Sequence, residues 1–134
     1  MKKKVLMIDD EEAFTRIVKL TLEDRGDFEV SVENNPLDAI AAARKFWPDI
    51  IVLDVVMPQL DGGEVHAQFR AEPVLKNIPI IFLTAIVRQK EIDEQNGMIG
   101  GSFYLAKPVS AAELVSAIDR HIRPSPAAPE KAVK

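Results

Sequence analysis

Hydrophobic residues gather in five short runs that alternate with longer segments of helical spacing. The runs predict strands at Val5–Ile8, Phe28–Val32, Ile50–Leu53, Ile80–Leu83 and Phe103–Ala106. Most of these runs are apolar at consecutive positions, which is typical of strands that are buried on both faces of a parallel sheet. We therefore predict an α/β fold in which helices cover both faces of the sheet.

Between the strands, apolar residues recur at intervals of three and four, which indicates helices. The predicted helices cover Phe14–Leu22, Leu37–Phe46, about Gly63–Ala71, Arg88–Gly97 and the segment from Ser110 to about Arg123. Asn35 followed by Pro36 is a favoured helix start, and Ser110 with Glu113 is a capping box. Strand and helix therefore alternate as (βα)5, a doubly wound five-stranded parallel sheet.

The length and composition fit one globular domain. The chain has 134 residues, of which 47% are hydrophobic and 28% charged, so it can bury a real core without disulfides or metal. It contains no Cys, which excludes disulfides and a cysteine nucleophile, and its two His argue against a multi-histidine zinc centre. The net charge of −4 argues against direct binding of nucleic acid.

The two ends of the chain look unlike the rest. Only the short run Val5–Ile8 follows the basic residues 2–4, which is too short for a signal peptide or a membrane span, so we predict no membrane insertion and a cytoplasmic protein. The segment 124–134 is rich in Pro and Ala and is predicted to be a disordered tail or a linker stub. The expected domain is therefore residues 1–123.

Polar residues follow four of the predicted strands at their carboxyl ends: Asp9-Asp10, Asp54, Thr84 and Lys107. In open parallel sheets these ends meet at one edge, where sites form. Neighbouring carboxylates repel by about 1–4 kcal/mol at 4 Å, so such a cluster favours a cation, and oxygen ligands favour Mg²⁺. A lysine and a hydroxyl beside them predict phosphoryl transfer, with a carboxylate as the nucleophile that forms an acyl phosphate.

These motifs carry a family resemblance. The set resembles the receiver domain of two-component response regulators over about residues 3–123, and its motifs are Asp9-Asp10, Asp54 with Met57-Pro58 and Asp61-Gly62, Thr84-Ala85, and Tyr104 with Lys107-Pro108. The resemblance implies a flavodoxin-like sheet with strand order 2-1-3-4-5, an order for which the family's chemotaxis member is a standard example.

The resemblance also implies roles for individual residues. Asp54 would accept a phosphoryl group from a phosphohistidine of a histidine kinase or a phosphotransfer protein. Asp10 would bind Mg²⁺ directly and Asp9 would assist, with Asp54 and the backbone carbonyl of Val56 as further ligands. The backbone amide of Val56 would hold a phosphoryl oxygen. Chemistry of this kind is self-catalysed phosphorylation and dephosphorylation, so no separate enzyme activity is expected.

The resemblance further implies which residues would bind the phosphoryl group and which would switch a binding face. Lys107 would contact a phosphoryl oxygen, and the hydroxyl of Thr84 and the amide of Ala85 would hold the others. Tyr104 would be the aromatic switch that turns inward with Thr84, and the peptide bond between Lys107 and Pro108 would be cis. The switched face would be that of the fourth helix, fifth strand and fifth helix, where a downstream protein or effector domain would bind. Glu11 and its neighbour Glu12 are interpreted as a solvated first helical turn.

Three alternatives to this function differ in the residues that they require. A flavodoxin needs a phosphate loop after the first strand, where the acidic residues 9–12 would repel phosphate. A dehalogenase-type phosphatase needs a second acid at the position of Val56 and usually a cap domain. A receiver-like module that binds partners without cycling phosphate stays open, as does whether the chain acts alone or as one domain of a longer protein. Val56 and Ile86 are apolar where side chains would tune water access, which predicts slow dephosphorylation.

Overall fold

A computed structural model describes residues 2–54, 62–84, 98–99, 102–107 and 109–122. The strands form one sheet in the order β2-β1-β3-β4-β6-β5. Their bounds are β1 Lys3–Ile8, β2 Phe28–Glu33, β3 Ile50–Asp54, β4 Ile80–Thr84, β5 Met98–Ile99 and β6 Ser102–Ala106. All neighbours from β2 to β6 pair in parallel. The five predicted parallel strands and their order 2-1-3-4-5 are thus confirmed, with β6 as the fifth predicted strand.

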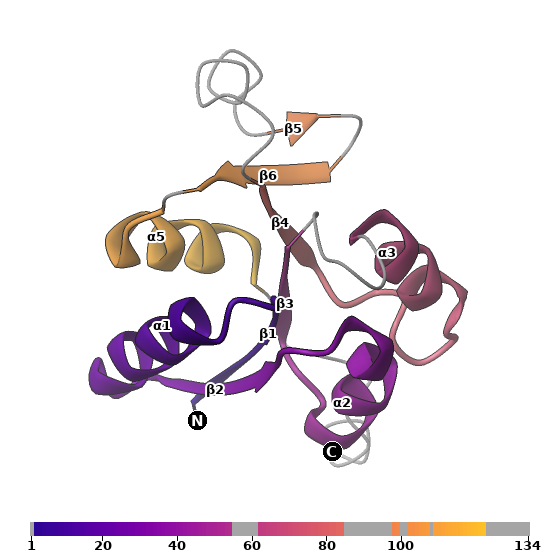
Figure 1. Ribbon diagram of the computed structural model, residues 1–134, viewed down its shortest axis with the longest axis horizontal. Helices are drawn as coiled ribbons and strands as arrows, with labels where there is room; N and C mark the ends of the chain where they lie inside the picture. The colour runs from indigo at the N-terminus through magenta and orange to yellow at the C-terminus, as the bar shows by residue number, and fades with distance from the viewer. Residues whose placement is uncertain (1, 55–61, 85–97, 100–101, 108, 123–134) are drawn as a thin grey trace.

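The short strand β5 was not predicted. It pairs antiparallel with β6, so that Met98 lies opposite Phe103 and Ile99 opposite Ser102. Figure 1 shows β5 at the outer edge of the sheet, beyond β6. A strand of two residues is too short to leave a periodic pattern in a sequence. The predicted helix at Arg88–Gly97 lies outside the described residues.

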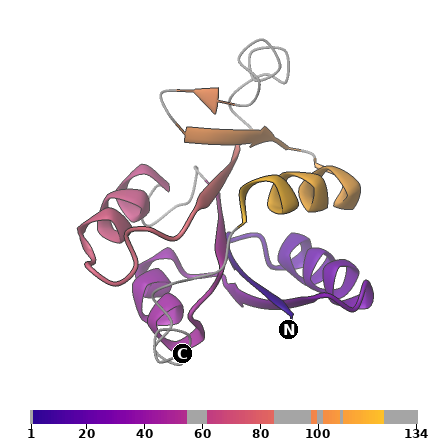
Figure 2. The same ribbon diagram turned by 180° about the vertical axis from the view of Figure 1, so that it is seen from behind.

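Helices cover both faces of the sheet, as the buried strands require. The helices α1 (Glu12–Asp24) and α5 (Ala111–His121) lie on one face, and α2 (Ala39–Phe46) and α3 (Gly62–Ala71) lie on the other (Figures 1 and 2). A 3₁₀ turn, η1 (Pro36–Asp38), precedes α2. Because these five strands run parallel, all their carboxyl ends point to one edge of the sheet.

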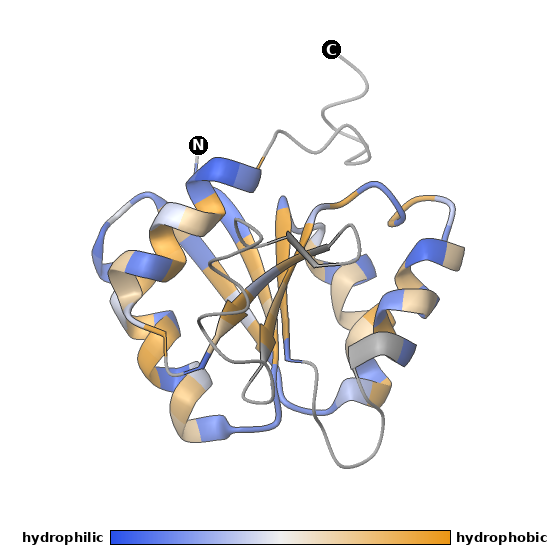
Figure 3. Ribbon diagram, turned by 90° about the horizontal axis from the view of Figure 1, so that it is seen from above, coloured by the Kyte–Doolittle hydropathy of each residue, from blue (hydrophilic) through white to orange (hydrophobic). Residues whose placement is uncertain are grey.

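The strands bury side chains in two separate cores. Along β1, Val5 and Met7 pack under α1 and α5, whereas Leu6 and Ile8 pack under α2 and α3, and all four are 0% exposed. Figure 3 shows the apolar strands between helices that carry both apolar and polar residues. Each such side chain contributes about 1.5–3 kcal/mol when it is fully buried. The sheet is therefore a firm base for the polar residues at its edge.

Local signals set the helix ends. The Ser110 side chain accepts from the Glu113 N–H at 3.1 Å, and the Glu113 carboxylate accepts from the Ser110 N–H at 2.9 Å, which confirms the capping box. Asn35 also caps as predicted, but it opens the 3₁₀ turn η1, and α2 begins only at Ala39. Trp47 closes α2 in the left-handed region with φ 55°.

Candidate functional site

Three carboxylates meet at the carboxyl edge of the sheet. Asp9 directly follows β1, and Asp54 ends β3, the strand beside it. Asp9 and Asp54 are 1% and 4% exposed, and Asp10 is half-buried. One carboxylate oxygen of each residue lies within 4.8 Å of those of the other two. The structure therefore brings together the three acids that the sequence predicted to converge.

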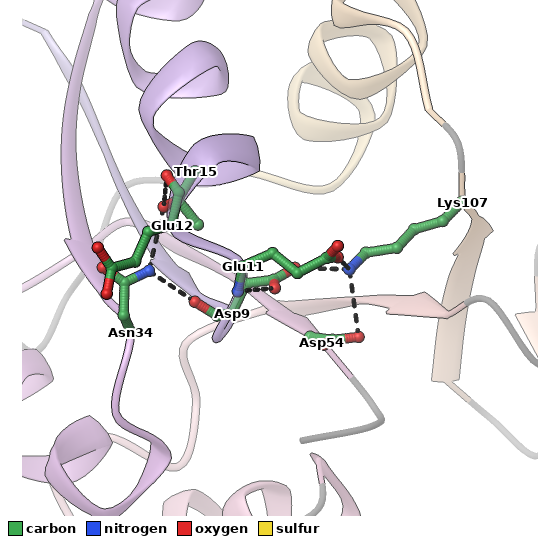
Figure 4. Close-up of polar contacts among 7 residues, drawn as sticks. All are labelled: Asp9, Glu11, Glu12, Thr15, Asn34, Asp54 and Lys107. Carbon is green, nitrogen blue, oxygen red and sulfur yellow. Dashed lines mark hydrogen bonds and ion pairs between the residues drawn. The ribbon is translucent and has the colours of Figure 1, made fainter. Parts of the chain in front are cut away.

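Lys107 joins this cluster from the end of β6. Its ammonium lies 2.8 Å from Asp9 Oδ2, 3.6 Å from Asp54 Oδ1 and 2.6 Å from Glu11 Oε1. Figure 4 shows the extended Lys107 side chain reaching between these carboxylates. The ring of Phe14 lies 5.0 Å below the ammonium, which adds a cation–π contact. Lys107 thus faces both the predicted acceptor and the predicted metal ligands.

Burial and charge oppose each other in this cluster. Burial raises the pKa of Asp9, although the Glu11 N–H, 3.0 Å away, and the contact with Lys107 favour its ionised form. Burial acts to lower the pKa of Lys107, but contacts with Asp9 and Glu11 and the charge of Asp54 outweigh it and raise the pKa above its ordinary range. Lys107 is therefore a permanent cation at physiological pH.

The donor set suits a hard divalent cation. Asp9, Asp10, Asp54 and Glu11 carry four negative charges around the single positive charge of Lys107. The buried Asp9 Oδ2 has no well-aligned hydrogen bond within the described residues. Carboxylate oxygens without His or Cys favour Mg²⁺ over zinc or copper. The residues present therefore fit the predicted magnesium site.

Two residues near the cluster were not assigned a role from the sequence. The Glu11 side chain is 61% exposed, which agrees with the interpretation of a solvated turn, but its carboxylate also forms the shortest contact of Lys107. Asn34, which follows β2, donates to the Asp9 carbonyl oxygen at 2.7 Å and to Thr15 Oγ1 at 3.1 Å (Figure 4). Asn34 directly follows β2, and Glu11 lies three residues after the end of β1, so their nearness to strand ends at the functional edge is the signal that could have indicated them.

The predicted switch residues lie on neighbouring strands. Thr84 ends β4 and is paired in register with Ala106. Tyr104 is half-buried in β6, and its ring stacks on that of Phe82 with centroids 4.9 Å apart. Val56, Ala85, Ile86 and Pro108 lie outside the described residues, as do residues 57, 58 and 61, so their implied roles stay predictions.

Comparison with known proteins adds a consistent result. Residues 5–119 match the family model of the response regulator receiver domain. The chain is 36% identical, over its whole length, to the alkaline phosphatase synthesis transcriptional regulatory protein PhoP of Bacillus subtilis, and covers 55% of that protein. It is 37% identical to the transcriptional regulatory protein TrcR of Mycobacterium tuberculosis, with 91% of this chain and 46% of TrcR covered.

Solved structures agree with these relatives. The chemotaxis protein CheY4 of Vibrio cholerae aligns with a TM-score of 0.75 and 31% identity, over 90% of this chain and 98% of that one. A Francisella response regulator receiver domain aligns with a TM-score of 0.73 and 29% identity, over 89% and 95% of the two chains. The chain spans about half the length of the curated relatives it matches. No helix among the described residues is long and apolar enough to cross a membrane.

Proposed function

Because the chain belongs to the response regulator receiver domain family, we propose that Asp54 accepts a phosphoryl group and that this event switches a protein-binding surface. The observation that supports Asp54 is its position: it is 4% exposed, 3.6 Å from the Lys107 ammonium and beside the acid pair. The nearly complete set of acids and lysine argues against the alternative of a module that does not cycle phosphate.

The proposed step is a displacement at phosphorus. An oxygen of the Asp54 carboxylate attacks the phosphorus of a phosphohistidine, an O–P bond forms, and the P–N bond breaks. The electron pair of that bond returns to the ring nitrogen, the other ring nitrogen already carries a proton so that neutral imidazole leaves, and Asp54 becomes an acyl phosphate. Asp9, Asp10 and Asp54 would hold Mg²⁺, which supplies positive charge to the phosphoryl oxygens.

Lys107 provides the second positive charge. In the unmodified protein it is closer to Glu11 and Asp9 than to Asp54. A phosphoryl group on Asp54 adds negative charge on the side of Asp54, so the ammonium is drawn from Glu11 toward the new oxygens. Because Lys107 directly follows β6, its reorientation would link the chemistry to the strand that carries Tyr104.

The signal would leave through β4 and β6. Thr84, at the end of β4, would follow the phosphoryl group, and Tyr104 would turn inward beside it. Tyr104 already stacks on Phe82, two residues before Thr84 on β4. This coupling would change the face formed by the predicted fourth helix, β6 and α5, where a target protein or an effector domain would bind.

The proposed partners follow from this chemistry. The phosphate donor is a histidine kinase or a histidine phosphotransfer protein, and because phosphohistidine is made from ATP the chain would act in the cytoplasm. PhoP and TrcR are transcriptional regulatory proteins of about twice this length, so control of transcription through an effector is one output. A domain of residues 1–123 with a tail at 124–134 remains our prediction.

The proposal is tested by chemical phosphorylation. The chain is incubated with phosphoramidate and Mg²⁺, and intact mass is measured before and after hydroxylamine. We expect one phosphoryl adduct that needs Mg²⁺, that hydroxylamine removes as it does an acyl phosphate, and that Asp54→Asn abolishes. Persistent labelling of Asp54→Asn would falsify the assignment of the acceptor.

A further inference from the structure

Asn34 lies just outside the predicted site but binds the backbone that carries the acid pair. Its side-chain Nδ2 donates to the Asp9 carbonyl oxygen at 2.7 Å and to the Thr15 hydroxyl at 3.1 Å. Figure 4 shows the Asn34 amide between Asp9 and the first turn of α1. Asn34 is half-buried and follows the last residue of β2, so the strand fixes its position.

The end of β2 holds the Asp9 peptide on both sides. The Asp9 N–H donates to the Glu33 carbonyl at 3.2 Å, and the Asp9 carbonyl accepts from Asn34. The Asp9 carboxylate is held as well, because Oδ1 accepts from the Glu11 N–H at 3.0 Å. The Asp9 carbonyl belongs to the peptide that leads into Asp10, so the Asn34 bond sets the direction in which the chain presents Asp10.

The second bond of Asn34 fastens α1. Thr15 is 1% exposed, and its hydroxyl accepts from Asn34 while it donates to the Glu12 carbonyl at 3.1 Å. The N-cap residue of α1, Glu11, makes no capping hydrogen bond with its side chain. Asn34 thus ties both ends of the short segment between β1 and α1 to the end of β2.

We propose that Asn34 is a positioning residue that presets Asp9 and Asp10 for Mg²⁺. Carboxylates gathered within 4.8 Å repel one another when no cation lies between them, so the backbone must hold them in place. A bond from a neighbouring strand to the ligand-bearing peptide does this without adding charge. The inference rests on the proposed function, since it concerns the metal that the phosphorylation would require.

The next residue offers a matched control. Asn35 is exposed, accepts from the Leu37 N–H at 3.1 Å and donates to Asp38 Oδ2 at 3.3 Å, both within its own turn. Asn34→Ala and Asn35→Ala therefore each remove a side-chain amide, from adjacent positions. The Asn34 amide binds Asp9, whereas the Asn35 amide binds within the turn η1. A loss of metal positioning would appear only in the first variant, and the stability of each variant is measured separately.

The test is the affinity of the unphosphorylated chain for Mg²⁺, measured by titration calorimetry. Urea unfolding without Mg²⁺ is run on every variant to separate stability from binding. We expect Asn34→Ala to bind Mg²⁺ about tenfold more weakly than the native chain, because groups that orient metal ligands typically carry effects of this size. Asn35→Ala is expected to stay within about twofold.

Thr15 supplies a second arm if Asn34→Ala fails to fold. Thr15→Ser keeps the hydroxyl and should keep native Mg²⁺ affinity, whereas Thr15→Val removes the hydroxyl and should weaken binding. Equal affinity in Thr15→Ser and Thr15→Val, or in Asn34→Ala and Asn35→Ala, overturns the inference while the proposed function stands. A native chain that neither binds Mg²⁺ nor takes the phosphoryl group overturns the proposed function, and the inference with it.

Discussion

Asp49 and Asp54 stand at opposite ends of β3, and both are nearly buried, at 7% and 4% exposed. Asp49 Oδ2 accepts from the Lys4 N–H at 3.0 Å, and the Asp49 N–H donates to the Lys4 carbonyl at 2.8 Å. Asp54 instead faces the Lys107 ammonium and two further carboxylates. Burial of a carboxylate alone therefore does not indicate a functional site in this protein. The charged groups around the carboxylate distinguish Asp54 from Asp49.

The same contrast holds for the two edges of the sheet. At the edge of Asp49, Lys3 pairs with Asp119 at 2.8 Å, and both side chains are more than a third exposed. Such a pair is screened by water and contributes little. At the edge of Asp54, the carboxylates of Asp9, Asp54 and Glu11 share one lysine, Lys107, whose side chain is only 13% exposed, and a fourth carboxylate, that of Asp10, lies beside Asp9 and Asp54. An excess of buried negative charge is costly, and it is useful only where a cation or a phosphoryl group is to be handled.

Replacing the lysine at each edge should reveal the largest difference in stability between the two edges. Lys107→Ala leaves Asp9 buried without its cation, so we expect a loss of about 3 kcal/mol in the free energy of unfolding. Lys3→Ala should lose less than about 1 kcal/mol. Urea unfolding measures both, and millimolar Mg²⁺ should restore part of the loss in Lys107→Ala only. Equal losses in the two variants would show that the edges do not differ.

Mg²⁺ itself should stabilise the native chain. Binding to the folded state adds about 1.4 kcal/mol when Mg²⁺ is tenfold above its Kd, which raises Tm. Asp10→Asn should remove most of this gain, whereas Asp49→Asn should retain it. Thermal unfolding with and without Mg²⁺ is the measurement. If Mg²⁺ leaves the Tm of the native chain unchanged, the acidic cluster is not a metal site.

Glu11 should have a smaller effect. Its side chain is 61% exposed, so Glu11→Gln should change the free energy of unfolding by less than about 1 kcal/mol. Asp54 then has one carboxylate fewer to compete with for the Lys107 ammonium. The initial rate of phosphorylation at saturating Mg²⁺ should therefore rise, by less than about tenfold. Glu12→Gln is the neighbouring control. A slower rate in Glu11→Gln would mean that Glu11 assists the reaction rather than competing for Lys107.

Glu23 should show the smallest effect, as a carboxylate far from the functional edge. The Val30 N–H at 2.9 Å and the Lys19 ammonium at 3.0 Å favour its ionised form, which holds its pKa below the ordinary 4.5. Its contribution is therefore present above the unfolded pKa and is lost as pH falls through the folded pKa. Glu23→Gln should lower stability at pH 7 by less than about 1 kcal/mol, since the side chain is 35% exposed.

Urea unfolding near pH 7 and near pH 3 checks this pH dependence. The difference between the native chain and Glu23→Gln should shrink on acidification. Asp24→Asn, on the exposed neighbour, should show little difference at either pH. A difference that persists unchanged in acid would mean that the Glu23 charge is not the source of the effect.

Much of the fold could be predicted because its signals are local. Continuous apolar runs such as Ile50–Leu53 show that a strand is buried on both faces, and Ser110 with Glu113 fixes a helix start within four residues. Parallel strands then place Asp9, Asp54 and Lys107 at one edge without any knowledge of coordinates.

What could not be predicted depends on contacts between distant segments. Asn34 reaches Asp9 across 25 positions, and Lys107 reaches Glu11 across 96. The hydrophobic periodicity of a sequence does not indicate which distant group a polar side chain will contact. The pairing of β5 with β6 could not be predicted either, because a strand of two residues leaves no pattern in the sequence. The sequence therefore indicates which groups share the edge, and the structure adds which of them hold the others in place.

We propose that the charges around Asp54 make this carboxylate, and not the similarly buried Asp49, the phosphoryl acceptor. Borohydride reduces an acyl phosphate of aspartate to homoserine, so reduction of the phosphorylated native chain followed by peptide mass spectrometry locates the acceptor. We expect homoserine at position 54 and unmodified aspartate at position 49. Homoserine at position 49, or spread over the exposed acids, would show that Asp54 is not the selected acceptor.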